Sequence, residues 1–177
     1  MRHSSSAVLA LAVGFGLLGF CSPQARAAEP AKLVVFDFEL EDYSAGGPLA
    51  GESPEETARL KLVTAEARKM LAESGRYELI DASAVDPERQ KAHWLRNCNG
   101  CEADIARQAG ADLAMLGIVQ KLSRLVHTVV FRIRDARTGA VTVNVQTDLR
   151  GDTDESWRRA VAWLIKNRLL ANEPATR

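Results

Sequence analysis

The sequence predicts an α/β (α+β) domain in which helices pack on a mixed β-sheet, in the order β-α-β-α-β-β-β-α. Residues 32–40 alternate apolar and polar side chains, which is the pattern of a strand. Residues 124–134 and 140–150 alternate in the same way around a Thr-Gly turn, which indicates a hairpin. Residues 54–74 and 154–170 repeat apolar side chains at helical spacing, so we expect two amphipathic helices packed on the sheet.

The first strand is expected to have one apolar face and one mainly acidic face. Alternation places four apolar side chains together: Val34, Phe36, Phe38 and Leu40. The opposite face would carry Val35, Asp37 and Glu39. The acidic run continues through Glu41 and Asp42.

This acidic run is interpreted as a polar sheet face paired with arginine. Alternate residues of a strand stand about 7 Å apart, so the carboxylates of one strand cannot surround a calcium ion. The polar faces of the hairpin offer three candidate partners: Arg132, Arg134 and Arg150. No metal site and no cofactor are predicted.

The first helix has a strong start signal. Ser53 and Glu56 match a capping box, with Pro54 at the first helical position. A short second strand is expected over residues 76–81, whereas residues 82–96 fit either a loop or a turn or two of helix.

The second half of the chain continues the alternation of helices and strands. A short helix over residues 101–109 precedes a third strand at residues 112–119. After the hairpin, Thr153 or Asp152 is expected to cap the last helix, and Trp157 belongs to its apolar stripe.

The amino terminus predicts export. Residues 7–20 are apolar and uncharged but too short to span a bilayer comfortably, and the Ala-Arg-Ala run at 25–27 matches a signal peptidase site. Residues 1–27 are therefore expected to be a cleaved signal peptide, and residues 28–177 a single domain in the periplasm. Lipidation at Cys21 is the alternative, disfavoured because the bulky Phe20 precedes it.

The charge balance excludes several partners. The chain has 23 basic and 23 acidic residues, and loss of Arg2 and Arg26 with the signal leaves a net charge of about −2. Nothing in this balance favours binding to nucleic acid or to an anionic membrane. Beyond the signal there is no long apolar run, so no transmembrane anchor is predicted.

The Cys98-Asn99-Gly100-Cys101 motif has four possible roles. A c-type haem site needs a histidine directly after the second cysteine, and this chain has Glu102 there. A zinc site needs four ligands, and the only histidines beyond the signal are His93 and His127. Haem and zinc are therefore disfavoured, which leaves a redox pair or a structural disulfide.

A structural disulfide between Cys98 and Cys101 is favoured over a catalytic one. Cys101 shares a predicted helix face with Ile105 and Ala109, so the bridge would lie against the core. A thioredoxin-like pair at a helix amino terminus is chemically reasonable, because the helix dipole lowers a thiol pKa. However, no proline lies between Cys101 and Pro174 to present a substrate.

No catalytic triad is visible in the sequence. His127 lies in an apolar strand without a G-x-S-x-G motif anywhere in the chain, so a packed histidine is expected. Trp163 lies about 120° around the last helix from Trp157 and is expected to be exposed, which makes it a candidate interface residue.

The chain resembles the amino-terminal domain of TolB and related bacterial envelope modules, including the curli-secretion lipoprotein and activators of penicillin-binding proteins. The likeness rests on the first strand at residues 32–40, the Ser-Gly-Arg-Tyr-Glu run at 74–78 and the Ala-Gly-Ala-Asp run at 109–112. It implies a strand, a helix, a second strand, a second helix and a closing hairpin.

More closely, the chain is similar to an uncharacterised family of periplasmic bacterial proteins. The likeness is carried by residues 36–39, Cys98, Cys101, residues 110–112 and the Arg-Gly-Asp-Thr-Asp-Glu-Ser-Trp run at 150–157. It implies a fold and a compartment but no chemistry. Asp37 and Glu39 belong to this motif set without an assigned role.

The last of these motifs has a structural explanation without a ligand. Arg150 would end a strand, Gly151 would free the backbone to turn, and Asp152 or Thr153 would cap the helix. Asp154 suits the positive end of that helix.

Taken together, these features predict a non-enzymatic periplasmic accessory module that binds another, unidentified envelope protein. A thiol-disulfide oxidoreductase using Cys98 and Cys101 is the first alternative, and a carrier of a small ligand or metal is the second. The oligomeric state is not predicted.

Overall fold

The structure is a computed structural model that describes residues 29–91 and 95–171. The predicted signal peptide, with its expected cleavage after Ala27, lies outside the described residues. His93 and Pro174 also lie outside them. None of the helices in the described ranges is long and apolar enough to cross a membrane.

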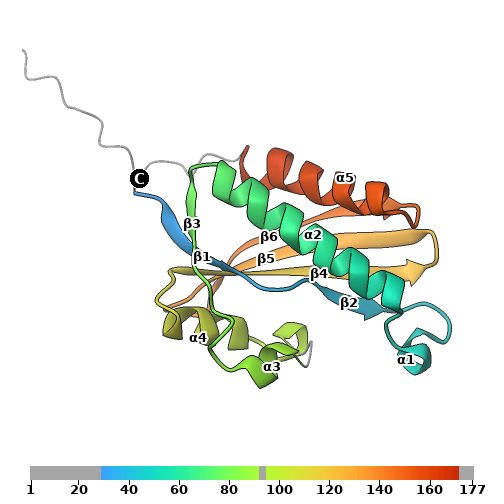
Figure 1. The fold of residues 1–177 in the computed structure, drawn as a ribbon, viewed down its shortest axis with the longest axis horizontal. Helices are drawn as coiled ribbons and strands as arrows, with labels where there is room; N and C mark the ends of the chain where they lie inside the picture. The colour runs from blue at the N-terminus through green and yellow to red at the C-terminus, as the bar shows by residue number, and fades with distance from the viewer. Residues whose placement is uncertain (1–28, 92–94, 172–177) are drawn as a thin grey trace, which may run out of the picture.

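Six strands form one mixed sheet (Figure 1). They are β1 (Ala31–Val35), β2 (Glu39–Asp42), β3 (Tyr77–Leu79), β4 (Leu113–Ser123), β5 (Val126–Asp135) and β6 (Val141–Arg150). The order is β3-β1-β4-β5-β6, and β2 pairs with β4 beyond the end of β1. β1 runs parallel to β3 and β4, and β2 runs parallel to β4, whereas β5 and β6 are antiparallel to their neighbours.

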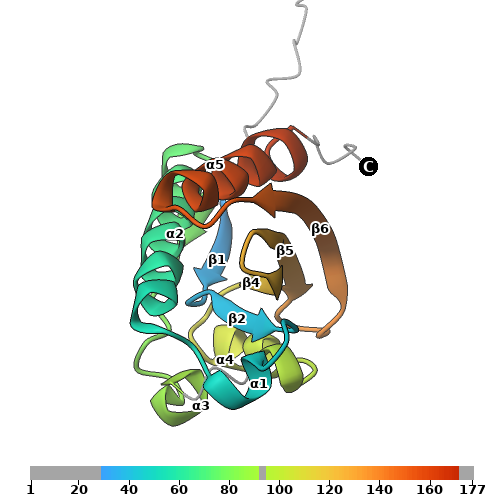
Figure 2. The ribbon, with the colours of Figure 1, turned by 90° about the vertical axis from the view of Figure 1, so that its right-hand side faces the viewer.

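Helices cover both faces of this sheet, which confirms the predicted fold class. They are α1 (Gly47–Ala50), α2 (Pro54–Glu73), α3 (Pro87–Lys91), α4 (Cys101–Gln108) and α5 (Asp154–Leu164), with a 3-10 turn at Leu95–Asn97 and a π-helical turn at Ile165–Leu169. Figures 1 and 2 show α2 and α5 side by side on one face and α4 on the opposite face. The helix α1 and the break between β1 and β2 are additions to the predicted order, whereas α3 is the turn of helix that the sequence allowed within residues 82–96.

The two long helices begin where the sequence predicts. Ser53 and Glu56 complete the capping box of α2: the Ser53 amide donates to Glu56 Oε2 at 2.8 Å, and the Glu56 amide donates to Ser53 Oγ at 3.2 Å. At α5 the cap is Thr153, whose Oγ1 accepts from the amide of Ser156 at 3.2 Å. Both caps supply partners for amides that the first helical turn leaves unpaired.

A larger apolar cluster lies between the sheet and the α2–α5 pair. Its most deeply buried large side chains are Leu33, Phe38, Leu71, Met115, Phe131, Ile133, Trp157 and Leu164. A smaller cluster, which includes Phe36 and Ile105, lies between the sheet and α4. The alternation of the first hairpin strand predicts one face with Leu125, His127, Val129, Phe131 and Ile133. The last four are buried, whereas Leu125 is exposed just before β5 begins.

The single first strand predicted over residues 32–40 is wrong, because the chain breaks there into β1 and β2. Leu33 pairs with Leu113, and Glu39 pairs with Ile118. Between these two pairs, the β1–β2 segment is therefore one residue longer than the matching segment of β4. A one-residue excess shifts every following side chain to the other face. Phe36 therefore packs toward α4 and Phe38 toward α2, although the alternation had placed them together.

Gly117 of β4 leaves space for the side chain of Phe38 beside the break. The ring of Phe38 occupies the space in which a Cβ on residue 117 would lie. Any side chain on residue 117 would collide with the ring, so Phe38 can enter the α2 side of the core only across a glycine.

Candidate functional site

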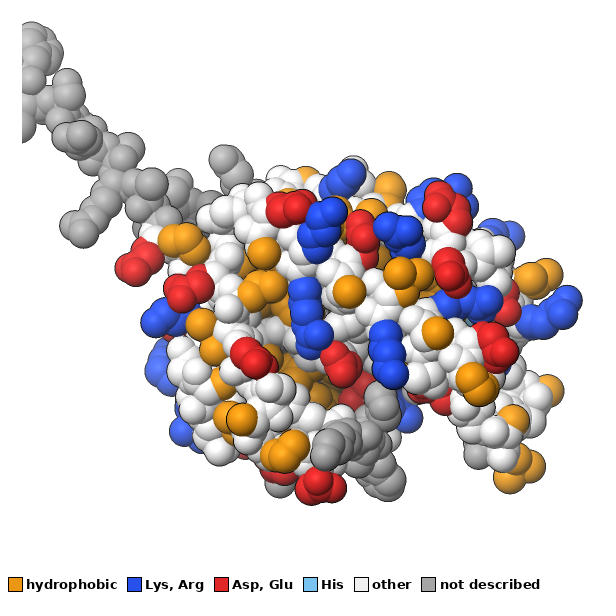
Figure 3. Space-filling model, in the orientation of Figure 1, with side chains coloured by type: hydrophobic (Ala, Val, Ile, Leu, Met, Phe, Trp, Pro, Cys, Tyr) orange, Lys and Arg blue, Asp and Glu red, His pale blue; other side chains and the backbone are white. Residues whose placement is uncertain are grey.

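An open groove lies over the break between β1 and β2, at the carboxyl ends of the parallel strands β1 and β3. It consists of two adjoining hollows of about 480 Å³ and about 330 Å³. The hollows share four lining residues: Phe36, Asp37, Ser83 and Gln90. In Figure 3 a hollow with an apolar floor is visible below α2, with basic and acidic side chains on its rim. Open α/β sheets commonly bind their ligands at this end of their strands.

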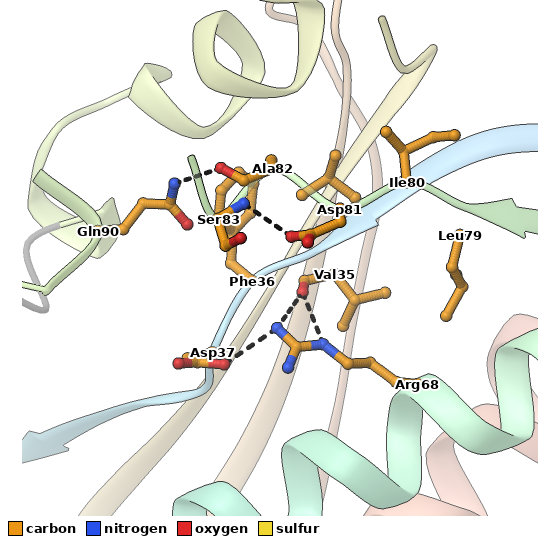
Figure 4. A pocket seen from close by; sticks show the side chains of 11 residues that line it. Val35, Phe36, Asp37, Arg68, Leu79, Ile80, Asp81, Ala82, Ser83 and Gln90 are labelled. Atoms are coloured by element: carbon orange, nitrogen blue, oxygen red, sulfur yellow. Dashed lines mark hydrogen bonds and ion pairs between the residues drawn. The ribbon is translucent and has the colours of Figure 1, made fainter. Parts of the chain in front are cut away.

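One wall of the groove is held by Arg68 of α2. Its Nε and Nη2 donate to the carbonyl oxygen of Val35 at 3.1 and 2.7 Å, and Nη2 also donates to Asp37 Oδ1 at 3.0 Å (Figure 4). Val35 is the last residue of β1, so the guanidinium satisfies a carbonyl at the point where strand pairing is interrupted. Asp37 is 71% exposed and lies on the rim.

The opposite wall follows β3 and is held by local hydrogen bonds. Gln90 Nε2 of α3 donates to the carbonyl oxygens of Ala82 and Val85 at 2.8 and 2.6 Å. The backbone amide of Ser83 donates to Asp81 Oδ1 at 2.8 Å. This hydrogen bond, together with one from the Ser83 side chain, lowers the pKa of Asp81, which keeps its carboxylate ionised on the rim.

Thr64 closes the floor where α2 meets the break. Its Oγ1 accepts from the amide of Phe38 at 2.9 Å and donates to the carbonyl oxygen of Leu60 at 2.7 Å. The break therefore leaves neither the Val35 carbonyl nor the Phe38 amide unpaired. Arg68, Thr64 and Gln90 thus all form hydrogen bonds with backbone groups.

Glu39, the first residue of β2, anchors the segment beyond the groove from the other face of the sheet. It is 1% exposed, and its carboxylate accepts from the amides of Leu95 and Arg96 at 3.0 and 3.1 Å and from Arg96 Nη1 at 3.0 Å. Leu95 in turn lines the smaller hollow. Glu39 thus fixes a part of the wall that lies more than fifty residues away in the sequence.

The predicted pairing of the acidic run with hairpin arginines is wrong. Asp37 pairs with Arg68, Glu39 with Arg96, and Asp42 with Lys121 at 3.0 Å. The side-chain Nε2 of Gln120 donates to Glu41 Oε2 at 2.8 Å. The break separates Asp37 from Glu39, so no continuous acidic face exists for the hairpin to neutralise.

Two of the hairpin arginines, Arg132 and Arg134, instead contact Glu102 of α4, which is fully buried. Its Oε1 accepts from Arg134 Nε at 2.8 Å and lies 3.3 Å from Arg132 Nη2. Arg134 Nη1 also donates to the carbonyl oxygen of Gly139 at 2.8 Å. These contacts join α4 to β5 and to the turn that follows it.

Cys98 and Cys101 are joined by a disulfide at the start of α4, with their Cα atoms 5.6 Å apart. Both cysteines are partly buried, and Cys101 packs against the apolar cluster that contains Ile105, as the helix face predicted. The bridge borders an open hollow of about 450 Å³, which Arg134 and the turn between β5 and β6 also line. Among the described residues, no three His, Cys, Asp or Glu side chains are grouped so as to hold a metal ion.

The Arg150–Trp157 motif forms the corner that joins β6 to α5. Gly151 has a φ of 101°, a value that favours glycine, and Thr153 caps the helix. Arg59 of α2 pairs with Asp152 and, at 3.1 Å, with Asp154. The corner is therefore tied to the neighbouring helix by its acidic residues.

The two aromatic residues singled out on α5 have different surroundings. Trp157 is buried and meets the ring of His127 edge-on at a centroid distance of 5.5 Å. Burial lowers the pKa of His127, although the charge of Asp152 opposes this. Trp163 is 43% exposed, with the Arg168 guanidinium 5.7 Å from its ring centroid, and it borders a shallow groove of about 250 Å³ between β6 and α5.

The structure thus distributes the sequence-predicted residues over four places. Asp37 lies at the groove, Glu39 beneath it, the cysteines at α4, and the last motif at the β6–α5 corner. Sequence reasoning missed Arg68, Thr64 and Ser83, which shape the groove. Arg68 and Thr64 bond across the strand break to distant residues, so no local pattern marks them. Ser83 bonds to the nearby Asp81, and its place on the groove depends on the fold.

Comparisons with known proteins give a family and a fold. The family described as "Protein of unknown function (DUF2380)" matches residues 31–169. A search of curated proteins finds no match.

Three solved structures illustrate the similarity. The PelC dodecamer from Paraburkholderia phytofirmans, in space group P6, has a TM-score of 0.50 and 16% identity, over 84% of this chain and 92% of that one. Lipoprotein GNA1162 from Neisseria meningitidis has a TM-score of 0.49 and 16% identity, over 79% and 99%. The LpoB C-terminal domain from Escherichia coli has a TM-score of 0.45 and 16% identity, over 71% and 87%. At such identities the similarity to PelC concerns the fold alone.

Proposed function

The chain belongs to the family described as "Protein of unknown function (DUF2380)", and we propose that it is a non-enzymatic module of the bacterial envelope that binds a segment of another envelope protein. The groove over the break between β1 and β2 is the binding site in this proposal. The predicted signal peptide, residues 1–27, supports a periplasmic location.

The observation that carries the proposal is that the polar side chains of the groove form hydrogen bonds with its own backbone. Arg68 is bonded to the Val35 carbonyl, Thr64 to the Phe38 amide, and Gln90 to two carbonyls. A general base or nucleophile must be available to a substrate proton or a reacting atom. These side chains are committed to holding the walls, which favours recognition over catalysis.

The lining of the groove fits a peptide segment. Its floor includes the apolar Phe36, Leu60 and Leu79. Its charged lining residues are the cations Lys61 and Arg68 of α2 and the carboxylates Asp37 and Asp81. The two hollows are continuous, because they share four residues. An extended segment with apolar anchors and charges of both signs matches such a surface. The fold is compatible with protein association, since PelC is described as a dodecamer.

Thiol-disulfide exchange is the second candidate, and the exposure of the bridge favours it. Cys98 and Cys101 are only partly buried and border an open hollow, whereas exchange requires access to a sulfur. Arg134 lines the same hollow, and a nearby cation lowers a thiol pKa. Against this candidate, no proline lies between Cys101 and Pro174 in the sequence to present a substrate.

The experiment is site-specific photo-crosslinking in the native envelope. A photoreactive phenylalanine analogue replaces Ser83, which is exposed and lines both hollows, or Ala140, which is exposed in the distant β5–β6 turn. We expect a discrete crosslinked protein from position 83 and none from position 140. Crosslinks of equal yield at both positions, or none at position 83, would contradict the proposal. A bound mass of a few hundred daltons in native mass spectra would replace it with a small-ligand carrier.

A further inference from the structure

The outer edge of β6 has no neighbour in the part of the chain that the structure describes. β6 is the last strand of the sheet order and is ten residues long. Figure 2 shows it at the margin of the sheet, with α5 above it and no segment along its outer side. A long uncovered edge is a template for pairing with another strand.

The register shows which backbone groups face outward. Val126 pairs with Arg150, and the Gly151 amide donates to the Leu125 carbonyl at 3.0 Å. In an antiparallel pair, residues alternately bond to one neighbour and to the other. Odd-numbered residues from 143 to 149 therefore bond to β5. The amides and carbonyls of Asn144, Gln146 and Asp148 project from the free edge.

Over most of its length, this edge lacks the features that usually prevent strand pairing. β6 contains no proline and no lysine, and its only register shift lies at its beginning, opposite Ile133 and Arg134. Of its exposed even-numbered side chains, Thr142, Asn144 and Gln146 are neutral, and the charged Asp148 and Arg150 lie at the end of the strand. Natural edge strands are normally protected by charges, prolines or bulges along their length.

We propose that β6 pairs with β6 of a second copy of this chain, antiparallel and about a two-fold axis at Gln146. This register places Asp148 opposite Asn144 of the copy, and Arg150 opposite Thr142. No like charges meet, and the facing amides and hydroxyls can bond across the pair. A two-fold interface is self-complementary, so each residue contributes twice.

Trp163 adds a contact beside the strand pair. The shallow groove between β6 and α5 is lined by Thr147, Arg159 and Trp163, all on the α5 side of the same edge. Pairing of β6 brings the α5 helices of both copies to the same face of the extended sheet. The exposed tryptophan of each copy then borders the contact, and tryptophan and arginine are the residues most enriched at interface centres.

The test is the mass in solution of the exported protein, measured by sedimentation equilibrium up to about 100 µM. We expect a dimer for the wild type and a halved mass for Gln146→Lys, which places two ammonium groups at the two-fold axis. Gln108→Lys, on the exposed side of α4, is the matched control and should remain dimeric. A monomeric wild type, or a dimer that survives Gln146→Lys, would overturn the proposal.

Hydrogen exchange keeps the test decisive if Gln146→Lys fails to fold. In the wild type, the amides of Asn144, Gln146 and Asp148 should exchange more slowly as the protein concentration rises. Concentration-independent exchange at these three amides would also overturn the proposal. The groove lies at β1 and β3, at the opposite end of the strand order from β6. Either result therefore leaves the proposed function separately testable.

Discussion

The two faces of the sheet are built on different physical principles. Under α2 and α5 the contact is a broad apolar cluster, and the buried polar side chains on this face include His127, Thr64 and the less deeply buried Glu56. Under α4 the cluster is smaller, and two fully buried carboxylates, Glu39 and Glu102, complete it. Apolar burial needs only the right kind of residue, whereas a buried carboxylate needs specific donors at specific places. The second face is therefore the one that fixes irregular segments, including a wall of the groove.

The largest expected effect is the loss of Glu39. Glu39→Ala leaves Arg96 and two backbone amides without their acceptor, so we expect the free energy of unfolding to fall by about 3 kcal/mol. Urea unfolding measures it. Asp37→Ala is the matched control, because its carboxylate is mostly exposed, and it should lower stability by less than about 1 kcal/mol. Equal effects of the two substitutions would remove the distinction between the faces.

A moderate effect is expected from the disulfide on the same face. Changing Cys98 and Cys101 to serine should lower stability by about 2 kcal/mol, because so short a loop restricts the unfolded chain only slightly. The melting temperature should then fall by about 6 °C. Differential scanning calorimetry measures both.

The same pair of variants separates structure from catalysis. We expect the wild type to leave the rate of insulin reduction by dithiothreitol unchanged. A wild type that accelerates the reaction, with a serine variant that does not, would make thiol-disulfide exchange the function.

The smallest effect concerns His127 on the apolar face. Burial lowers its pKa below the ordinary 6.5, so the unfolded chain binds a proton that the folded chain does not. The stability that the buried, neutral imidazole of His127 contributes is complete above pH 6.5 and declines as the pH falls below that value. The difference in unfolding free energy between wild type and His127→Leu should shift against the wild type from pH 7 to pH 5. A pH-independent difference would show that the imidazole is not desolvated.

The sequence predicted the face that depends on local patterns. The capping box of α2 spans four residues, and the stripe of α5 and the alternation of β5 are periodic, so each is visible in a short window. The other face was not predictable in this way. Glu39 meets Arg96, and Glu102 meets Arg134, across separations of 57 and 32 residues.

The break between β1 and β2 was not predicted from the sequence for a different reason. The apolar–polar alternation continues through Phe36, Asp37 and Phe38 without interruption, although the chain changes face there. The one local signal is Gly117, an isolated glycine in a strand, which commonly marks a close approach or a bulge. The groove follows from this break, so it could not be found before the break was known.

The central claim is that the groove over the break binds a segment of an envelope partner. The most direct measurement is a titration of the ¹⁵N-labelled protein with the peptide that crosslinks to position 83, followed by amide chemical shifts. We predict saturable shifts at Asp37, Ser83 and Gln90 and none along β6. Shifts confined to β6 and Trp163, or no saturable shift at the groove, would contradict the account.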